Sequence, residues 1–186
     1  MFGDIFGFLL EIAFTLFGAA LLIRAWMQAI TLPRFNPLGH TIAQFTEWLV
    51  GPLRRVVPSA GRIAWECLLA AWLTAVVYIA LKWFITVGAL IPARGIPVVL
   101  GAALLMVVRW ALNLVVWLTL IQAIMSWINP AAPLMPFLQM LTAPILNPIR
   151  RVLPATAIDF SPIVVLVLAQ VGIIIVTRIS YQLFGF

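Results

Sequence analysis

The sequence has few of the side chains on which catalysis and cofactor binding depend. It contains one cysteine, Cys67, and one histidine, His40, in 186 residues. A single cysteine cannot close a disulfide within the chain, and a single histidine excludes bis-histidine ligation of a haem within one molecule. A zinc site, which takes several cysteine or histidine ligands, is equally hard to build. We therefore expect no cofactor or metal, a buried Cys67 and a solvated His40.

Acidic residues are also scarce, which argues against catalysis by paired carboxylates. The sequence has five of them, far apart along the chain: Asp4, Glu11, Glu47, Glu66 and Asp159. Glu47 and Asp159 meet only if their two segments pack together. Hydrolase and phosphate-loop motifs are absent. The sequence thus favours a protein that is not an enzyme.

What the sequence does contain is apolar surface and arginine. Hydrophobic residues make up 65% and charged residues 9% of the chain, and the mean hydropathy is +1.19. Such a composition is incompatible with a water-exposed surface and predicts an integral membrane protein. The net charge of +6 comes almost entirely from arginines, mostly outside the apolar runs. This placement favours lipid headgroups over nucleic acid as the partner.

Four apolar runs are long enough to cross a bilayer as helices, which takes about 20 residues. They cover approximately residues 5–30, 63–90, 98–128 and 163–184. The beginning lacks the basic region and cleavage site of a secretory signal, so we expect the first run to remain as a span. The third run is too long for one simple crossing, so 98–108 is either a separate membrane-associated piece or part of an extended helix. The stretch 91–97, IPARGIP, is predicted to be a tight turn.

Two connectors between these runs share a pattern. The first, NPLGHTIAQFTEWLVGPLRRVVP, begins at Asn36-Pro37, and the second, NPAAPLMPFLQMLTAPILNPIRRVLPATAIDFSP, begins at Asn129-Pro130. A short insertion in the second aligns the two Arg-Arg pairs and these further positions: Thr46 with Thr142, Pro52 with Pro148, and Pro58 with Pro154. The chain is therefore predicted to consist of two tandem two-helix repeats, residues 1–91 and 97–186. The fold class is an all-α membrane protein with four transmembrane helices.

Each connector is predicted to contain an amphipathic helix that lies in the membrane interface. In the first, Asn36 and Pro37 form a helix start, and apolar residues recur at steps of three and four: Ile42, Phe45, Leu49, Leu53 and Val56. Gly51-Pro52 should break or kink this helix. Because of Pro136, Pro144 and Pro148, we expect the second connector to form two short pieces with a bend. A cap formed by Asp159, Ser161 and Pro162 should open the last span.

Several polar residues interrupt the apolar runs and are candidate functional residues: Arg24, Gln28, Glu66, Lys82, Arg109, Asn113, Gln122 and Gln170. Arg24 and Gln28 lie one helical turn apart, where the arginine can extend to the headgroups and the glutamine can bond a neighbour. Gln122 shares a face with Ser126, a spacing typical of interhelical hydrogen bonding. Glu66 and Lys82 are expected to reach water or headgroups near the ends of their span.

The arginine distribution predicts the orientation of the chain. The connectors carry six arginines: Arg34, Arg54, Arg55, Arg62, Arg150 and Arg151, whereas the turn on the other side has only Arg94. By the positive-inside rule, the connectors face the cytoplasm and both termini face outward.

The connector motifs resemble the YggT family of bacterial and plastid membrane proteins. The resemblance rests on Asn-Pro, a threonine and P-x-R-R-x-x-P in the first connector, and on TAPILNPIRRVLP followed by DFSP in the second. It covers nearly the whole chain, although the first connector has Glu47-Trp48 in place of Ala143-Pro144. Family membership implies a small protein of the bacterial inner membrane. Relatives are associated with osmotic tolerance and cation homeostasis, with membrane organisation or cell division, and, in plastids, with haem attachment.

Two classes of function remain open. In the first, Arg54, Arg55, Arg150 and Arg151 hold lipid phosphates or an acidic partner, and the protein is a scaffold or assembly factor that contacts other membrane proteins or itself. In the second, the protein handles ions, which requires ionisable groups that face a wet cavity. The scarcity of charge within the spans favours the scaffold.

Overall fold

The computed structural model describes residues 2–31, 37–57, 61, 63–152 and 159–184, and within these ranges it is all-helical. Six α-helices follow one another, with a short 3-10 helix before the fourth: α1 Phe2–Ala29, α2 Pro37–Val56, α3 Trp65–Val87, η1 Ala93–Gly95, α4 Ile96–Ile128, α5 Met135–Val152 and α6 Ser161–Phe184. The four predicted spans are therefore helices, and two shorter helices connect them in pairs.

Helices α1, α3, α4 and α6 are long and apolar enough to cross a membrane. Their outward faces carry large exposed hydrophobic side chains such as Leu16, Phe84 and Ile174, which suit contact with lipid rather than water. Residues 98–108 belong to α4, which runs unbroken for 33 residues. The long third run is thus an extended helix and not a span with a separate piece.

The turn between α3 and α4 follows from local backbone chemistry. Helix α3 ends at Gly88, whose φ of 72° is a left-handed conformation that glycine adopts without steric strain. The Gly88 N–H donates to the Phe84 carbonyl at 2.9 Å. Pro97, near the first position of α4, has no N–H to leave unpaired. The predicted turn at 91–97 is confirmed, with η1 inside it.

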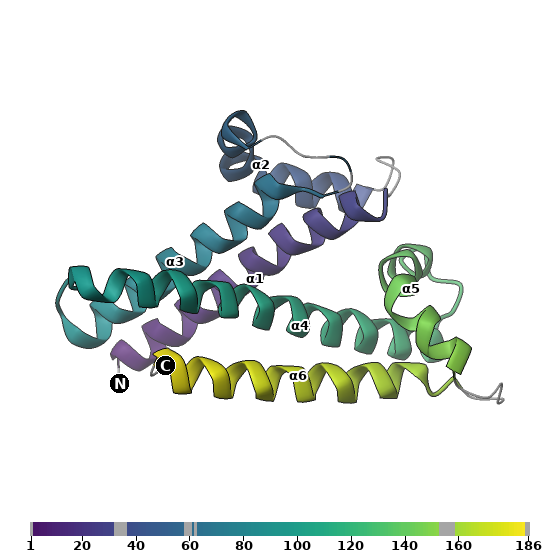
Figure 1. Cartoon of the computed structure of the whole chain (residues 1–186). Coiled ribbons are helices and arrows are strands. Elements are labelled where there is room, and N and C mark those ends of the chain that lie inside the picture. Colours follow the sequence, from purple (N-terminus) through teal and green to yellow (C-terminus); the bar gives the residue numbers. More distant parts are fainter. Residues whose placement is uncertain (1, 32–36, 58–60, 62, 153–158, 185–186) are drawn as a thin grey trace.

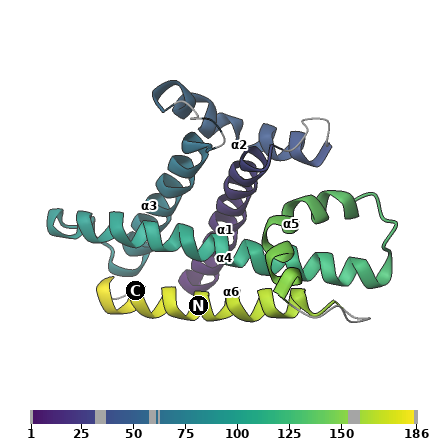
Figure 2. The ribbon, with the colours of Figure 1, turned by 45° about the vertical axis from the view of Figure 1, so that its right-hand side comes forward.

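The long helices form two pairs. Figure 1 shows α1 beside α3 and α4 beside α6, with α2 lying across the ends of the first pair and α5 across the ends of the second. The pairs diverge toward these connector helices (Figure 2). Both termini and the α3–α4 turn lie at the other end of the molecule.

The pairs meet where α1 and α3 pack on α4. Small residues of α3 and α4 are fully buried there, among them Ala71, Ala75 and Ala103, so that the helix backbones approach closely. The ring of Trp110 is 2% exposed and lies against Gly18 of α1, where any side chain would collide with it. Gly18 therefore permits the close packing of α1 on α4.

Each connector forms one continuous helix, so the expectation of a break at its prolines is wrong, whereas the bend expected in the second connector is visible in α5 in Figure 2. Helix α2 continues through Pro52, and α5 continues through Pro144 and Pro148. All three prolines lie on exposed faces, where water or headgroups can accept the hydrogen bonds that proline leaves unmade. The opposite face of α5 buries Leu138, Leu141 and Leu146, and this packing offsets the loss of helical hydrogen bonds.

Candidate functional site

A polar junction ties α1, α2 and α3 together beneath the first connector. Arg24 of α1 donates from Nη1 to the Thr46 hydroxyl at 2.8 Å and to the Ala43 carbonyl at 2.9 Å. Its Nη2 lies 2.5 Å from Glu47 Oε2. The Arg24 side chain is only 12% exposed. The expectation that Arg24 extends to the headgroups is therefore wrong, because all three of its partners lie on α2.

Glu66 extends this junction to α3. Its side chain is 1% exposed, and its Oε1 lies 3.7 Å from Nε of Arg54. Nη1 of the same arginine lies 3.7 Å from Glu47 Oε1. The second oxygen of Glu66, Oε2, is buried without a hydrogen-bond partner among the described residues. Glu66 was expected to reach water or headgroups, and this too is wrong, because α2 covers the start of α3.

The charges of this junction set the acidity of Glu47. The hydrogen bond from Arg24 lowers the pKa of Glu47 below its ordinary value, and the charges of Arg24 and Arg54 act in the same direction. Burial opposes them but is outweighed. Glu47 thus stays ionised over the physiological range and holds both arginines.

A second junction ties α4 to α5 at the corresponding place. Thr142 of α5 is fully buried and donates to the side-chain oxygen of Gln122 on α4. The Thr142 hydroxyl also lies 2.8 Å from the Leu138 carbonyl, as Thr46 lies 2.8 Å from the Ile42 carbonyl in α2. The interhelical hydrogen bond predicted for Gln122 is confirmed.

The second junction continues to α6 through Arg150. Its Nη2 lies 2.7 Å from Asp159 Oδ2, and its Nε lies 3.3 Å from the Ser161 hydroxyl. Asp159 accepts the Ser161 backbone N–H at 3.0 Å, which confirms the predicted cap at the start of α6. Burial raises the pKa of Asp159, but the hydrogen bonds from Ser161 and Arg150 outweigh it and leave the pKa below its ordinary value.

The two arginines of each doublet have different surroundings. The first members, Arg54 and Arg150, pair with the acidic residues described above. The second members, Arg55 and Arg151, are exposed in the last turns of α2 and α5 and have no ion pair or hydrogen bond with any residue that the structure describes. Sequence reasoning treated each doublet as a unit, but among the described residues its first arginine is paired and its second is not.

Thr46 and Thr142 are central to the junctions but were not predicted as functional residues. Both hydroxyls are buried, each facing the polar residue one or two turns from the end of the preceding span. Their recurrence in the aligned connectors was the available signal. A hydrogen bond also joins α1 to α5, from the Trp26 indole N–H to the Leu141 carbonyl at 2.9 Å. Nothing in the sequence pattern predicted that bond.

The other predicted residues take several positions. Gln28 makes no side-chain hydrogen bond within the described ranges, and Gln170 is exposed on α6. Asn113 donates to the Arg109 carbonyl one turn earlier at 2.9 Å. Lys82 is exposed near the end of α3, and with Arg109 it lines a cavity far from the junctions.

The remaining motif residues act at helix ends. Asn129 caps α4, Pro130 lies in the following turn, and Pro162 is the second residue of α6. Helix α2 begins at Pro37. Asn36, Pro58 and Pro154, together with Arg34 and Arg62, lie outside the described residues.

The isolated cysteine and histidine are placed as expected. Cys67 is fully buried in α3, next to Glu66, and His40 is exposed on α2. Within the described ranges, no cluster of three or more histidine, cysteine or acidic residues has the geometry of a metal site.

Comparison with known proteins gives a consistent result. A sequence model of the CCB3/YggT family matches residues 3–85 and 101–180. The chain is 36% identical over 166 residues to a protein of Escherichia coli K12 named "Uncharacterized protein YggT", covering 88% of this chain and 85% of that protein. It is 32% identical over 162 residues to "Uncharacterized protein in proC 3'region" of Vibrio alginolyticus, covering 86% of each. No solved structure matches the chain. The chain therefore belongs to the CCB3/YggT family.

Proposed function

We propose that this protein is a membrane scaffold, not an enzyme, in which two copies of one unit present arginines to anionic lipid headgroups or acidic partners. The units comprise residues 1–91 and 97–186. The observation that carries this proposal is that Arg55 and Arg151, at the ends of two corresponding helices, are exposed and have no partner among the described residues. A guanidinium group binds a phosphate through two parallel hydrogen bonds, so each of these arginines can hold one headgroup.

The internal pairing of the preceding arginine supports this division of labour. Arg54 and Arg150 bind the start of the next span through Glu66 and Ser161. Each doublet therefore combines an arginine that pairs with residues of its own unit and an arginine that has no partner among the described residues. The second arginine also lies at the C-terminal end of its helix, where the helix dipole attracts cations.

The paired arrangement of the helices supports the proposal that the chain contains two copies of one unit. Contacts of α1 with α3 correspond to those of α4 with α6, and each connector helix touches both long helices of its own pair. The family model also matches the chain in two separate segments of similar extent. In a bacterial inner membrane with both connectors at the cytoplasmic side, the arrangement puts Arg55 and Arg151 on the face rich in anionic lipid.

The test is the binding of phosphatidylglycerol to the full chain in detergent, followed by native mass spectrometry. The variant Arg55→Gln/Arg151→Gln should retain fewer anionic lipids than the wild type, with affinity lower by about tenfold per lost guanidinium. The matched control is Arg54→Gln/Arg150→Gln, one residue earlier in each helix, which should lose stability but keep the lipids. Equal lipid retention in the wild type and in the 55/151 variant contradicts the headgroup role.

The alternative function is ion handling, and one observation favours it. Glu66 carries a buried oxygen without a hydrogen-bond partner among the described residues, and ionisable groups within spans are a common feature of ion pathways. Reconstitution into vesicles separates the two functions. Cation flux that is lost in Glu66→Ala and Gln122→Ala variants establishes ion handling and removes the scaffold proposal.

A further inference from the structure

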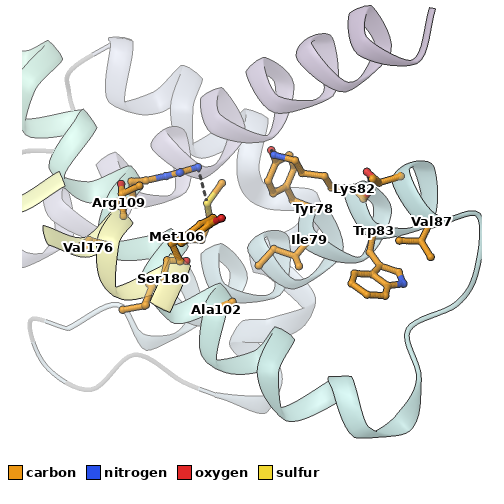
Figure 3. Close-up of a pocket in the computed structure, with 14 residues that line it drawn as sticks. Tyr78, Ile79, Lys82, Trp83, Val87, Ala102, Met106, Arg109, Val176 and Ser180 are labelled. Atoms are coloured by element: carbon orange, nitrogen blue, oxygen red, sulfur yellow. Dashed lines mark hydrogen bonds between the residues drawn. The ribbon is translucent and has the colours of Figure 1, made fainter. Parts of the chain in front are cut away.

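A cavity of about 370 Å³ lies between α3, α4 and α6, toward the end of the molecule that holds the termini. Figure 3 shows its lining, to which α3 contributes Lys82 and α4 contributes Arg109. Most of the wall is apolar, with Ile79, Trp83 and Met106 among the lining side chains. The cavity is thus an apolar pocket with two cationic groups at its wall.

Neither cation has an acidic partner. Lys82 Nζ lies 3.4 Å from the Tyr78 hydroxyl and 5.7 Å from the centre of its ring. Arg109 Nη2 lies 3.1 Å from the sulfur of Met106, which is a weak acceptor. Within the described part of the chain, no carboxylate lies within ion-pair distance of either group. The two cationic ends point toward each other across the cavity region in Figure 3.

Unpaired cations in apolar helices call for a counter-ion. Charged side chains of membrane-spanning helices are costly unless they pair or reach a polar ligand. Glu11 of α1 lines an adjoining cavity together with Tyr78 and Lys82, so this acidic group of the facing helix lies near Lys82. With one negative and two positive side chains around the two cavities, the set carries one excess positive charge.

We propose that this cavity binds one anionic phospholipid, with the headgroup phosphate between Lys82 and Arg109. A phosphodiester carries a single negative charge, which balances the excess. The acyl chains then lie along the apolar wall and the exposed apolar faces of α3 and α6. Lys82 lies five residues before the end of α3, or about 8 Å along the helix, which suits the level of a headgroup. An inorganic anion uses the two cations but not the wall.

This site is independent of the arginines on the connector helices. It is built from other residues, and it lies toward the end of the bundle away from α2 and α5. Failure of one lipid site therefore leaves the other untouched, and the same assay distinguishes them by variant.

The experiment titrates the detergent-purified full chain with phosphatidylglycerol and counts bound lipids by native mass spectrometry. In the Lys82→Gln/Arg109→Gln variant, we expect the affinity of this cavity for the lipid to fall about a hundredfold, which is about tenfold for each lost cation. The matched control is Arg178→Gln, an exposed α6 cation at the same end of the molecule that does not line the cavity. Its affinity should change less than about threefold, as expected of a screened surface charge.

A second variant keeps both cations and fills the space. Thr177 of α6 lines the cavity, and Thr177→Trp should block the acyl chains and lower lipid affinity at least about tenfold. Unchanged binding in both the cation-deleted and the filled variant overturns the proposal. The proposal is also overturned if millimolar inorganic phosphate displaces phosphatidylglycerol and the Thr177→Trp variant binds the lipid with wild-type affinity. The ligand of the two cations is then a free anion. The proposal is supported if phosphate does not displace the lipid, if both Lys82→Gln/Arg109→Gln and Thr177→Trp lose lipid affinity, and if Arg178→Gln does not.

Discussion

The two polar junctions occupy corresponding places but use different chemistry. In the first, Arg24 reaches a buried threonine and an acidic residue beside it. In the second, the neutral Gln122 reaches a buried threonine, and Ala143 follows where the first has Glu47. In both junctions a polar residue of a span binds a threonine of the connector helix. That polar residue can be either a charged arginine or a neutral glutamine.

The comparison indicates that the threonine contact positions the connector helix, while the charges adapt to what surrounds it. A buried arginine is tolerated in the first junction because Glu47 compensates it. A buried glutamine needs no such partner. Exchanging the arginine and the glutamine between the two junctions therefore tests this interpretation most directly.

The largest effect on stability is expected when an arginine is introduced into the second junction without a carboxylate to pair with it. Gln122→Arg buries a guanidinium beside Thr142 with no carboxylate, and we expect it to lower the free energy of unfolding by about 3–5 kcal/mol. Adding Ala143→Glu recreates the first junction and should recover at least half of that loss. Denaturant unfolding in detergent measures both. A double variant no better than the single one contradicts the correspondence of the junctions.

A smaller effect is expected from the opposite exchange. Arg24→Gln retains a hydrogen bond to Thr46 and leaves Glu47, which is 50% exposed, to water and Arg54, so it should cost about 1 kcal/mol. Arg24→Ala removes the Thr46 contact as well and should cost about 3 kcal/mol. If both variants unfold at the same denaturant concentration, the threonine contact does not position α2.

The smallest effect is the dependence of stability on pH. The pKa values of Glu47 and Asp159 lie below their ordinary values of 4.5 and 3.8. The stability that these groups contribute is complete above the ordinary values and is lost as the pH falls through the lowered ones. We expect thermal unfolding temperatures to fall below about pH 4.5, and Glu47→Gln and Asp159→Asn each to flatten that fall. Parallel curves for the variants and the wild type contradict this assignment.

The sequence predicted the spans well because their signal is local. An apolar run of sufficient length is a helix in a membrane whatever its neighbours, so α1, α3 and α6 begin and end within a few residues of their expected bounds. The cap at Asp159 was also predictable, because the accepting carboxylate and the donating N–H of Ser161 lie only two residues apart.

The partners of the polar residues were not predictable in this way. Arg24 finds Glu47 across 23 residues, and the spacing of Arg24 from Gln28 cannot distinguish a headgroup from a carboxylate on another helix. The expectation that the prolines of α2 and α5 interrupt their helices failed for a related reason. Proline weakens an isolated helix, but packing against the long helices decides whether the helix persists.

The central claim is that two corresponding units present Arg55 and Arg151 at one membrane surface. Cysteine labelling tests it directly, with Arg55→Cys and Arg151→Cys made separately in a Cys67→Ala background. In intact cells or oriented vesicles, a membrane-impermeant maleimide should label both positions from the same side and neither from the other. Labelling of the two positions from opposite sides contradicts the account.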